Sequence, residues 1–247
     1  MRRAPCLSLV AALALWPAIA AARSPGDVRG VGANGRVVFT FDDGPSYATT
    51  PTLIEKLDRA RVRAAFFVNG YRFAGEGEVP RRNRAVLAEM RRRGHIIGNH
   101  AYQHLRLGDL SPARQRWQIL RNEEAILRVA GVRTRHFRPP FGKAGAAARE
   151  FAAERGYVKV MWNIEPRDHL VRSARKLADR ILALVRERNG GIVLLHDNHA
   201  WSVEAFGLAL EGFERENASR AAQGLPPFRV AEPEELLGPA SAAQARR

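Results

Sequence analysis

Residues 37–45 read Val-Val-Phe-Thr-Phe-Asp-Asp-Gly-Pro. The stretch from Val37 to Phe41 is short and almost wholly apolar, which is typical of a buried β-strand. Asp42 and Asp43 follow it directly, and Gly44-Pro45 then carries turn residues. The three residues Asp42, Gly44 and Pro45 could form a plain turn. The alternative is a buried strand whose end carries reactive carboxylates.

Outward from this strand, short apolar runs alternate with longer stretches of helical period. The runs cover residues 37–41, 64–68, 95–98, 136–138, 157–162 and 191–196. Helices are predicted over residues 50–60, 82–93, 112–129, 144–155 and 174–188. This alternation indicates a mainly parallel sheet, and about seven such units in one chain favour a closed barrel over an open sheet. We therefore predict an α/β fold, a distorted (β/α) barrel with about seven parallel strands.

The 247 residues are enough for one large core, so we expect a single catalytic domain over residues 36–237. A basic start at Arg2 and Arg3, an apolar stretch and small residues predict a signal peptide over 1–22. An uncleaved membrane anchor is the alternative. Residues 23–35 are expected to form a linker, and residues 238–247 a disordered tail. The expected destination is outside the cytoplasm: periplasmic, cell-envelope-associated or secreted, with no membrane span after signal cleavage.

Cys6 is the only cysteine and lies inside the predicted signal peptide. The mature protein can therefore use neither disulfides nor thiolate ligands, and any metal must be held by histidine and carboxylate. The formal net charge is +15, and about +13 without Arg2 and Arg3. This charge favours an anionic neighbourhood, such as an acidic cell-wall polymer or a membrane surface. Because no nucleic-acid-binding motif is present, we expect no nucleic-acid partner. A plain solvated helix surface would also account for the charge.

Polar residues fall where strands of such a barrel would end, which is where barrel enzymes keep their reactive groups. They are Asp42 and Asp43, His100 and His104, Arg138, Asp168, and His196 with Asp197. Two adjacent carboxylates repel each other when desolvated, so a cation, an arginine or a proton must balance them. His100 and His104 are four residues apart, which would place both on one face of a helical turn. With a carboxylate they would bind a divalent ion, whereas an ordinary helix surface is the plain alternative.

The combination resembles the polysaccharide deacetylase family, which includes chitin, peptidoglycan and nodulation-oligosaccharide deacetylases. The likeness extends from about Arg36 to Val230. Its motifs are Thr40-Phe41-Asp42-Asp43-Gly44-Pro45-Ser46, His100-Ala101-Tyr102-Gln103-His104, Arg138-Pro139-Pro140-Phe141-Gly142, Glu165-Pro166-Arg167-Asp168-His169 and Leu194-Leu195-His196-Asp197. Five motifs in the family's order rarely arise by chance.

The resemblance implies a role for each matching residue. Asp43, His100 and His104 would bind the metal, which in this family is usually zinc, although another divalent transition metal is an alternative. Asp42 would be the general base, held ionised by Arg138, and His196 the general acid, oriented by Asp168. The implied substrate-binding residues are Phe141, whose backbone N–H would also stabilise an oxyanion, Leu194 in the acetyl pocket, and Pro139.

Amide hydrolysis requires an activated water, a stabilised oxyanion and a proton for the leaving nitrogen, and these residues offer all three. The expected function is removal of N-acetyl groups from an N-acetylated polysaccharide or oligosaccharide. The substrate expected first is peptidoglycan or another N-acetylglucosamine polymer. The alternatives are an esterase acting on O-acetylated glycan, a small-amide hydrolase, and a non-catalytic carbohydrate-binding protein. The sequence does not determine the oligomeric state.

Three residues depart from the family's usual pattern. Ala101 stands where Ser or Thr is usual, so a hydroxyl beside the metal loop is absent and metal affinity or choice could change. His169 replaces the usual tryptophan, and Phe141 stands where tyrosine is commoner, which alters the groove wall. Asp197 is interpreted as a loop carboxylate. The histidines 95, 136 and 199 are interpreted as structural or solvated.

Overall fold

The computed structural model describes residues 27–238. The predicted signal peptide, residues 1–22, and almost all of the predicted tail lie outside the described residues. Seven parallel strands form one curled sheet in the order β5-β4-β3-β2-β1-β6, and β7 pairs with the start of β1. The strands are β1 (Arg36–Gly44), β2 (Ala65–Val68), β3 (Ile96–Asn99), β4 (His136–Phe137), β5 (Val158–Lys159), β6 (Gly191–His196) and β7 (Arg229–Val230). The prediction of a barrel-like α/β fold with about seven parallel strands is confirmed.

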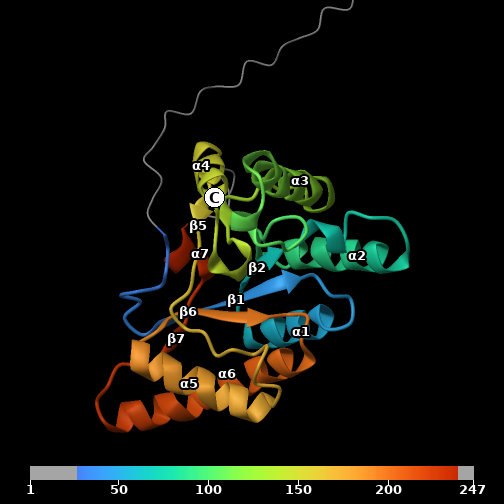
Figure 1. Ribbon diagram of the computed structural model, residues 1–247. Coiled ribbons are helices and arrows are strands. Elements are labelled where there is room, and N and C mark those ends of the chain that lie inside the picture. The colour runs from blue at the N-terminus through green and yellow to red at the C-terminus, as the bar shows by residue number, and fades with distance from the viewer. Residues whose placement is uncertain (1–26, 239–247) are drawn as a thin grey trace, which may run out of the picture.

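Helices surround this sheet (Figure 1). They are α1 (Thr50–Ala60), α2 (Glu78–Arg92), α3 (Pro112–Ala130), α4 (Ala146–Glu154), α5 (Ala174–Arg188), α6 (Ala200–Ala222) and α7 (Pro233–Leu237), with short 3₁₀ turns η1 (Gly70–Arg72), η2 (Leu107–Asp109) and η3 (Pro140–Gly142). Helices α5 and α6 pack together beside β6 and β1, and α3 packs on α4 at the other end of the sheet. None of the described helices has the length and apolar character needed to cross a bilayer.

The two edges of the sheet approach each other without a continuous ladder between them. After β5, the chain forms single parallel bridges from Val160 to Val28 and from Ile164 to Val193. The run predicted as a strand over residues 157–162 is therefore a strand only at Val158–Lys159, because the chain must bend there to reach β6. Helices α6 and α7 and strand β7 were not predicted.

The side chains of strand β1 lie in two different environments. Phe39 and Phe41 face the helices, where the Phe39 ring meets Phe206 of α6 at 4.9 Å and the Phe41 ring stacks on Phe66 at 5.3 Å. Because side chains alternate along a strand, Val38, Thr40 and Asp42 face the interior of the curled sheet. The end of β1 therefore delivers the Asp42 carboxylate into a buried interior.

Candidate active site

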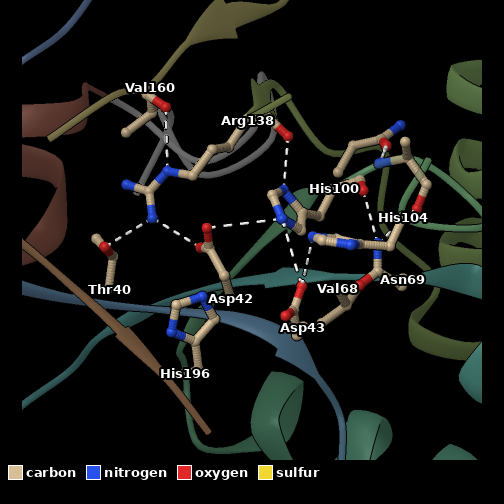
Figure 2. Close-up of polar contacts among 12 residues, drawn as sticks. Thr40, Asp42, Asp43, Val68, Asn69, His100, His104, Arg138, Val160 and His196 are labelled. Atoms are coloured by element: carbon tan, nitrogen blue, oxygen red, sulfur yellow. Dashed lines mark hydrogen bonds and ion pairs between the residues drawn. The ribbon is translucent and has the colours of Figure 1, made fainter. Parts of the chain in front are cut away.

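Asp42 is buried at the carboxyl end of β1 and is paired with Arg138, which follows β4 and is fully buried. Arg138 Nη1 donates to Asp42 Oδ1 at 2.7 Å and to Thr40 Oγ1 at 2.8 Å, and its Nε donates to the Val160 carbonyl at 3.1 Å (Figure 2). Burial raises the pKa of the Asp42 carboxyl above its usual value, and the Arg138 guanidinium opposes this rise. The contact leaves the second carboxylate oxygen of Asp42 facing away from Arg138.

Asp43 reaches the same site because the β1 ladder is irregular at this point. The register with β2 shifts between Asp42 and Gly44, and Asp43 adopts the left-handed conformation with φ +70°. A bulge of this kind re-aims a side chain at a strand end. In a regular strand Asp43 would face the helices, as Phe39 and Phe41 do, whereas the bulge turns its carboxylate toward the side on which Asp42 lies.

The turned carboxylate meets His100 and His104. Asp43 Oδ1 lies 3.5 Å from His100 Nε2 and 3.1 Å from His104 Nε2, and Asp42 Oδ2 lies 3.7 Å from His100 Nε2. The expectation that the two histidines share one face of a helical turn is wrong. Residues 100–106 form an irregular loop, in which Ala101 and His104 have positive φ values of 61° and 54°. The loop, rather than helical spacing, brings the two rings to 5.1 Å.

The chemistry of this cluster fits a divalent metal ion. His100 Nδ1 lies 2.7 Å from the Arg138 carbonyl, which can only accept, so Nδ1 carries the proton and the Nε2 lone pair faces Asp43. Burial lowers the pKa of His100 to about 3, so the ring is neutral. Within residues 27–238, Asp43 Oδ1 is buried without a hydrogen-bond donor. Asp43, His100 and His104 each offer one ligand atom, and these atoms lie within 4.8 Å of one another.

His196, the last residue of β6, is held by Asp168. Asp168 Oδ1 lies 2.8 Å from His196 Nδ1, and Asp168 Oδ2 accepts from the His196 backbone N–H and from Ser202 Oγ, both at 2.7 Å. Burial by itself would lower the pKa of His196, but the hydrogen bond and charge of Asp168 and the nearby carboxylates Asp42 and Asp43 outweigh it. The pKa of His196 rises to about 9. The imidazole is therefore a cation at neutral pH.

The three residues assigned to substrate binding lie around this site. Phe141 is 48% exposed, adopts a left-handed conformation in η3, and brings its ring 4.7 Å from that of His104. Pro139 is buried directly before η3. Leu194 is 6% exposed on β6, in register with Thr40 of β1. Because Val193 and Leu195 pack among the helices, Leu194 faces the interior side that also holds Asp42.

Asparagines that the sequence analysis missed support the histidine loop. Asn69 Nδ2 donates to the carbonyls of His100 and Ala101 at 2.6 and 3.0 Å, and Asn99 Oδ1 accepts from the Ala101 backbone N–H at 2.9 Å. Asn122 Nδ2 donates to Asn99 Oδ1 at 2.8 Å. Asn69 and Asn99 each stand at the end of an apolar run, which is the signal that identified Asp42. The same signal could have found them.

Asp197 and the remaining histidines have defined surroundings. Asp197 lies in a turn but is fully buried, accepts from Thr50 Oγ1 at 2.5 Å, and has its pKa raised to about 7 by burial. His95 and His136 are buried beside backbone groups, in keeping with a structural role. His199 lies closer to the site than expected, because its ring stacks on Trp201 at 4.6 Å and lies 5.9 Å from that of His196.

Comparison with known proteins identifies relatives of this chain. Residues 30–160 match the family model described as polysaccharide deacetylase. This range holds Asp42, Asp43, His100, His104 and Arg138, whereas Asp168 and His196 lie beyond it.

Two curated proteins and one solved structure are similar to the chain. A peptidoglycan-N-acetylglucosamine deacetylase of Bacillus cereus is 31% identical over 160 residues, which are 65% of this chain and 55% of that protein. A chitooligosaccharide deacetylase of Bradyrhizobium sp. is 34% identical over 184 residues, 74% of this chain and 78% of that protein. The chain thus spans about half the length of the first relative. The structure of a chitin deacetylase from the fungus Colletotrichum lindemuthianum superposes with a TM-score of 0.71 at 26% identity, covering 87% of this chain and 92% of that one.

Proposed function

The chain belongs to the polysaccharide deacetylase family, and we propose that it hydrolyses the N-acetyl groups of an amino-sugar polysaccharide with a divalent metal ion held by Asp43, His100 and His104. The observation that carries the proposal is the position of Asp42. Its Oδ1 is held by Arg138, and its Oδ2 faces the cluster from 3.7 Å away. A carboxylate held in this way is suited to take a proton from a water molecule beside the cluster.

The bound ion, for which we propose zinc, would act as a Lewis acid toward the attacking water and the acetyl carbonyl. Asp42 Oδ2 would accept the proton of that water, and the buried Arg138 would keep Asp42 oriented throughout. The backbone N–H of Phe141, a residue whose ring lies 4.7 Å from that of His104, would donate to the developing oxyanion. Leu194 and Pro139 would bind the acetyl methyl group and exclude water from it.

His196 would supply the proton that the leaving nitrogen needs. Its Nδ1 is engaged by Asp168, so Nε2 is the atom that delivers the proton. Because the pKa of His196 is raised to about 9, the ring holds that proton at neutral pH. The buried Asp168 balances the charge of the imidazolium and fixes its orientation, while Ser202 Oγ holds Asp168 in turn.

Peptidoglycan is the first substrate that we propose, ahead of chitin-type oligomers and O-acetylated glycan such as xylan. The similarity to a peptidoglycan deacetylase and the net charge of +15 support this order. Because such a substrate lies outside the cytoplasm, we propose that the protein is exported and acts in the periplasm, in the cell envelope or outside the cell.

Acetate release tests the proposal. Purified protein is incubated with N-acetylglucosamine oligomers and with peptidoglycan, before and after chelation, and again after zinc is restored. We expect release that is lost on chelation and recovered with zinc. Release from xylan alone would instead support an O-acetyl esterase, and no release from any acetylated glycan would support a small-amide substrate or a binding role.

A further inference from the structure

An arginine lies over an aromatic ring on the metal-binding side of the site. The guanidinium carbon of Arg106 is 4.5 Å from the centroid of the Phe141 ring, and that ring is itself 4.7 Å from the ring of His104. Arg106 is exposed, and Phe141 is 48% exposed. Contact with an aromatic face orients a guanidinium while its N–H groups remain free to bind.

A second pair of this kind lies on the side of His196. The guanidinium carbon of Arg172 is 5.7 Å from the centroid of the Trp201 ring. Trp201 Nε1 donates to the Asp168 carbonyl at 2.7 Å, which ties the indole to the residue that holds His196. Arg172 is exposed, so its guanidinium is accessible to solvent.

Both arginines are unpaired cations. Across residues 27–238, the guanidinium of neither Arg106 nor Arg172 forms an ion pair or hydrogen bond, whereas Arg155 binds Glu123 at 2.7 Å. Figure 2 shows His104 and His196 on different sides of Asp42. The Arg106–Phe141 pair adjoins His104. The Arg172–Trp201 pair is connected to His196 through His199, whose ring stacks on Trp201 at 4.6 Å and lies 5.9 Å from the His196 ring. The two pairs therefore lie on the His104 side and the His196 side of Asp42. They offer one free cation on each flank.

We propose that Arg106 and Arg172 bind carboxylates carried by the two sugars that neighbour the N-acetylated sugar being hydrolysed. The inference rests on the proposed function and narrows its substrate to glycans in which neutral N-acetylated sugars alternate with carboxylate-bearing sugars. An acetyl group that reaches Asp42 and His196 places its sugar between the two flanks. The next sugars in the polymer then pass over Phe141 and Trp201. A guanidinium binds a carboxylate through two parallel N–H groups, a contact that a neutral glycan cannot offer.

The test compares two oligomers of equal length on the metal-loaded full chain. One is a neutral N-acetylglucosamine oligomer, and the other alternates N-acetylglucosamine with N-acetylmuramic acid, which carries a carboxylate. The measured quantity is the ratio of kcat/KM for the anionic oligomer to that for the neutral one. We expect Arg106→Gln and Arg172→Gln each to lower this ratio by about 2- to 5-fold, the range for exposed ion pairs. The double variant should lower it by about 10-fold, through KM.

Arg116→Gln is the matched control, because Arg116 is an exposed arginine over the ring of Phe151, at 5.9 Å, on helix α3. It should leave the ratio unchanged. Arg106→Lys, which keeps the charge and loses the paired N–H groups, should recover part of the ratio. Raising the salt concentration should lower the ratio in the unmodified protein and less so in the double variant.

An unchanged ratio in both glutamine variants, or an equal fall in Arg116→Gln, would overturn the assignment of the two arginines. Acetate release from the neutral oligomer separates this failure from that of the proposed function. If the unmodified protein deacetylates the neutral oligomer and the ratio does not respond, only the anionic preference is wrong. If it releases acetate from neither oligomer, the deacetylase proposal itself fails.

Discussion

The Asp197 carboxylate occupies the space that a side chain on Gly44 would require. A methyl group on Gly44 would overlap both oxygens of Asp197, which is fully buried and held by Thr50 Oγ1 at 2.5 Å. Thr50 Oγ1 also accepts from the Ser46 backbone N–H at 2.9 Å. Gly44 directly follows Asp43, so this packing ties the turn after β1 to the residue after His196. Glycine is needed at position 44 because the Asp197 carboxylate lies too close to leave room for a side chain.

Gly44→Ala should therefore displace Asp43 from the two histidines. We expect metal affinity to fall by about 10- to 100-fold, the range for residues that support metal ligands. Titration against a competing chelator measures this affinity without reference to activity. Gly108→Ala is the control, since a methyl group there meets no atom within 4 Å. Equal metal affinity in both variants would contradict the supporting role of the Gly44 contact.

Asp42→Asn removes the proposed base and keeps the size of the side chain. We expect kcat to fall by about 10²- to 10⁴-fold, the usual contribution of a general base. Metal content should persist, because the ligands Asp43, His100 and His104 are intact. Acetate release and metal analysis on the same preparation give both values. Full activity in this variant would remove the main support for the enzymatic proposal.

Asp168→Asn tests the proton on His196. The carboxylates raise the pKa of His196 to about 9, and the protonated form is the proposed acid, so activity should persist through neutral pH and decline as pH rises through about 9. Without the Asp168 charge, this decline should move toward the ordinary histidine value of about 6.5. A pH profile of kcat measures it. Ser202→Ala, which removes one hydrogen bond to Asp168 but keeps its charge, should move the decline less.

The same shift has a consequence for stability. The folded-state pKa of His196 lies above its unfolded value of about 6.5, so its contribution is complete below pH ~6.5 and is lost as pH rises through about 9. The free energy of unfolding should therefore decrease between these pH values, by no more than about 3 kcal/mol from this residue. Denaturant unfolding at both pH values measures the change. His196→Gln should show a smaller decrease, and an equal decrease would mean that other groups cause it.

Arg138→Met removes the cation that faces Asp42 in the interior. Breaking a buried ion pair by removing one partner typically costs about 3–5 kcal/mol, because the remaining charge is unpaired. We expect this loss in the free energy of unfolding near neutral pH, and less of it where Asp42 can be protonated. The double variant Asp42→Asn/Arg138→Met should recover part of the stability. No recovery would show that packing of the arginine, not its charge, accounts for the loss.

Local patterns predicted most of the framework because strands and helices have fixed periods. The apolar run over 191–196 and the helix over 174–188 have their expected bounds. Helix α6 was missed because its apolar residues do not gather on one face, although Ala205, Phe206 and Phe213 are buried in the main hydrophobic core. Most of the polar residues at strand ends were likewise identified from position, since parallel strands end at one edge. Asp168 is the exception, because it lies in a turn between β5 and β6 and not at a strand end.

The sequence by itself determined which residues meet at that edge: the side-chain types and their order along the chain predict a sheet whose strand ends bring together Asp42, Asp43, His100, His104, Arg138, Asp168 and His196. Only the tertiary structure decided which of these residues contact one another. The left-handed bulge at Asp43 turns its carboxylate toward the side on which Asp42 lies, and an irregular loop, not a helix, aligns His100 with His104. The tertiary structure also decided which arginines remain unpaired. Arg106 and Arg172 lie over aromatic rings that distant segments of the chain contribute. Period and composition act over a few residues, whereas the direction of a side chain at a strand end depends on packing between segments far apart in the chain.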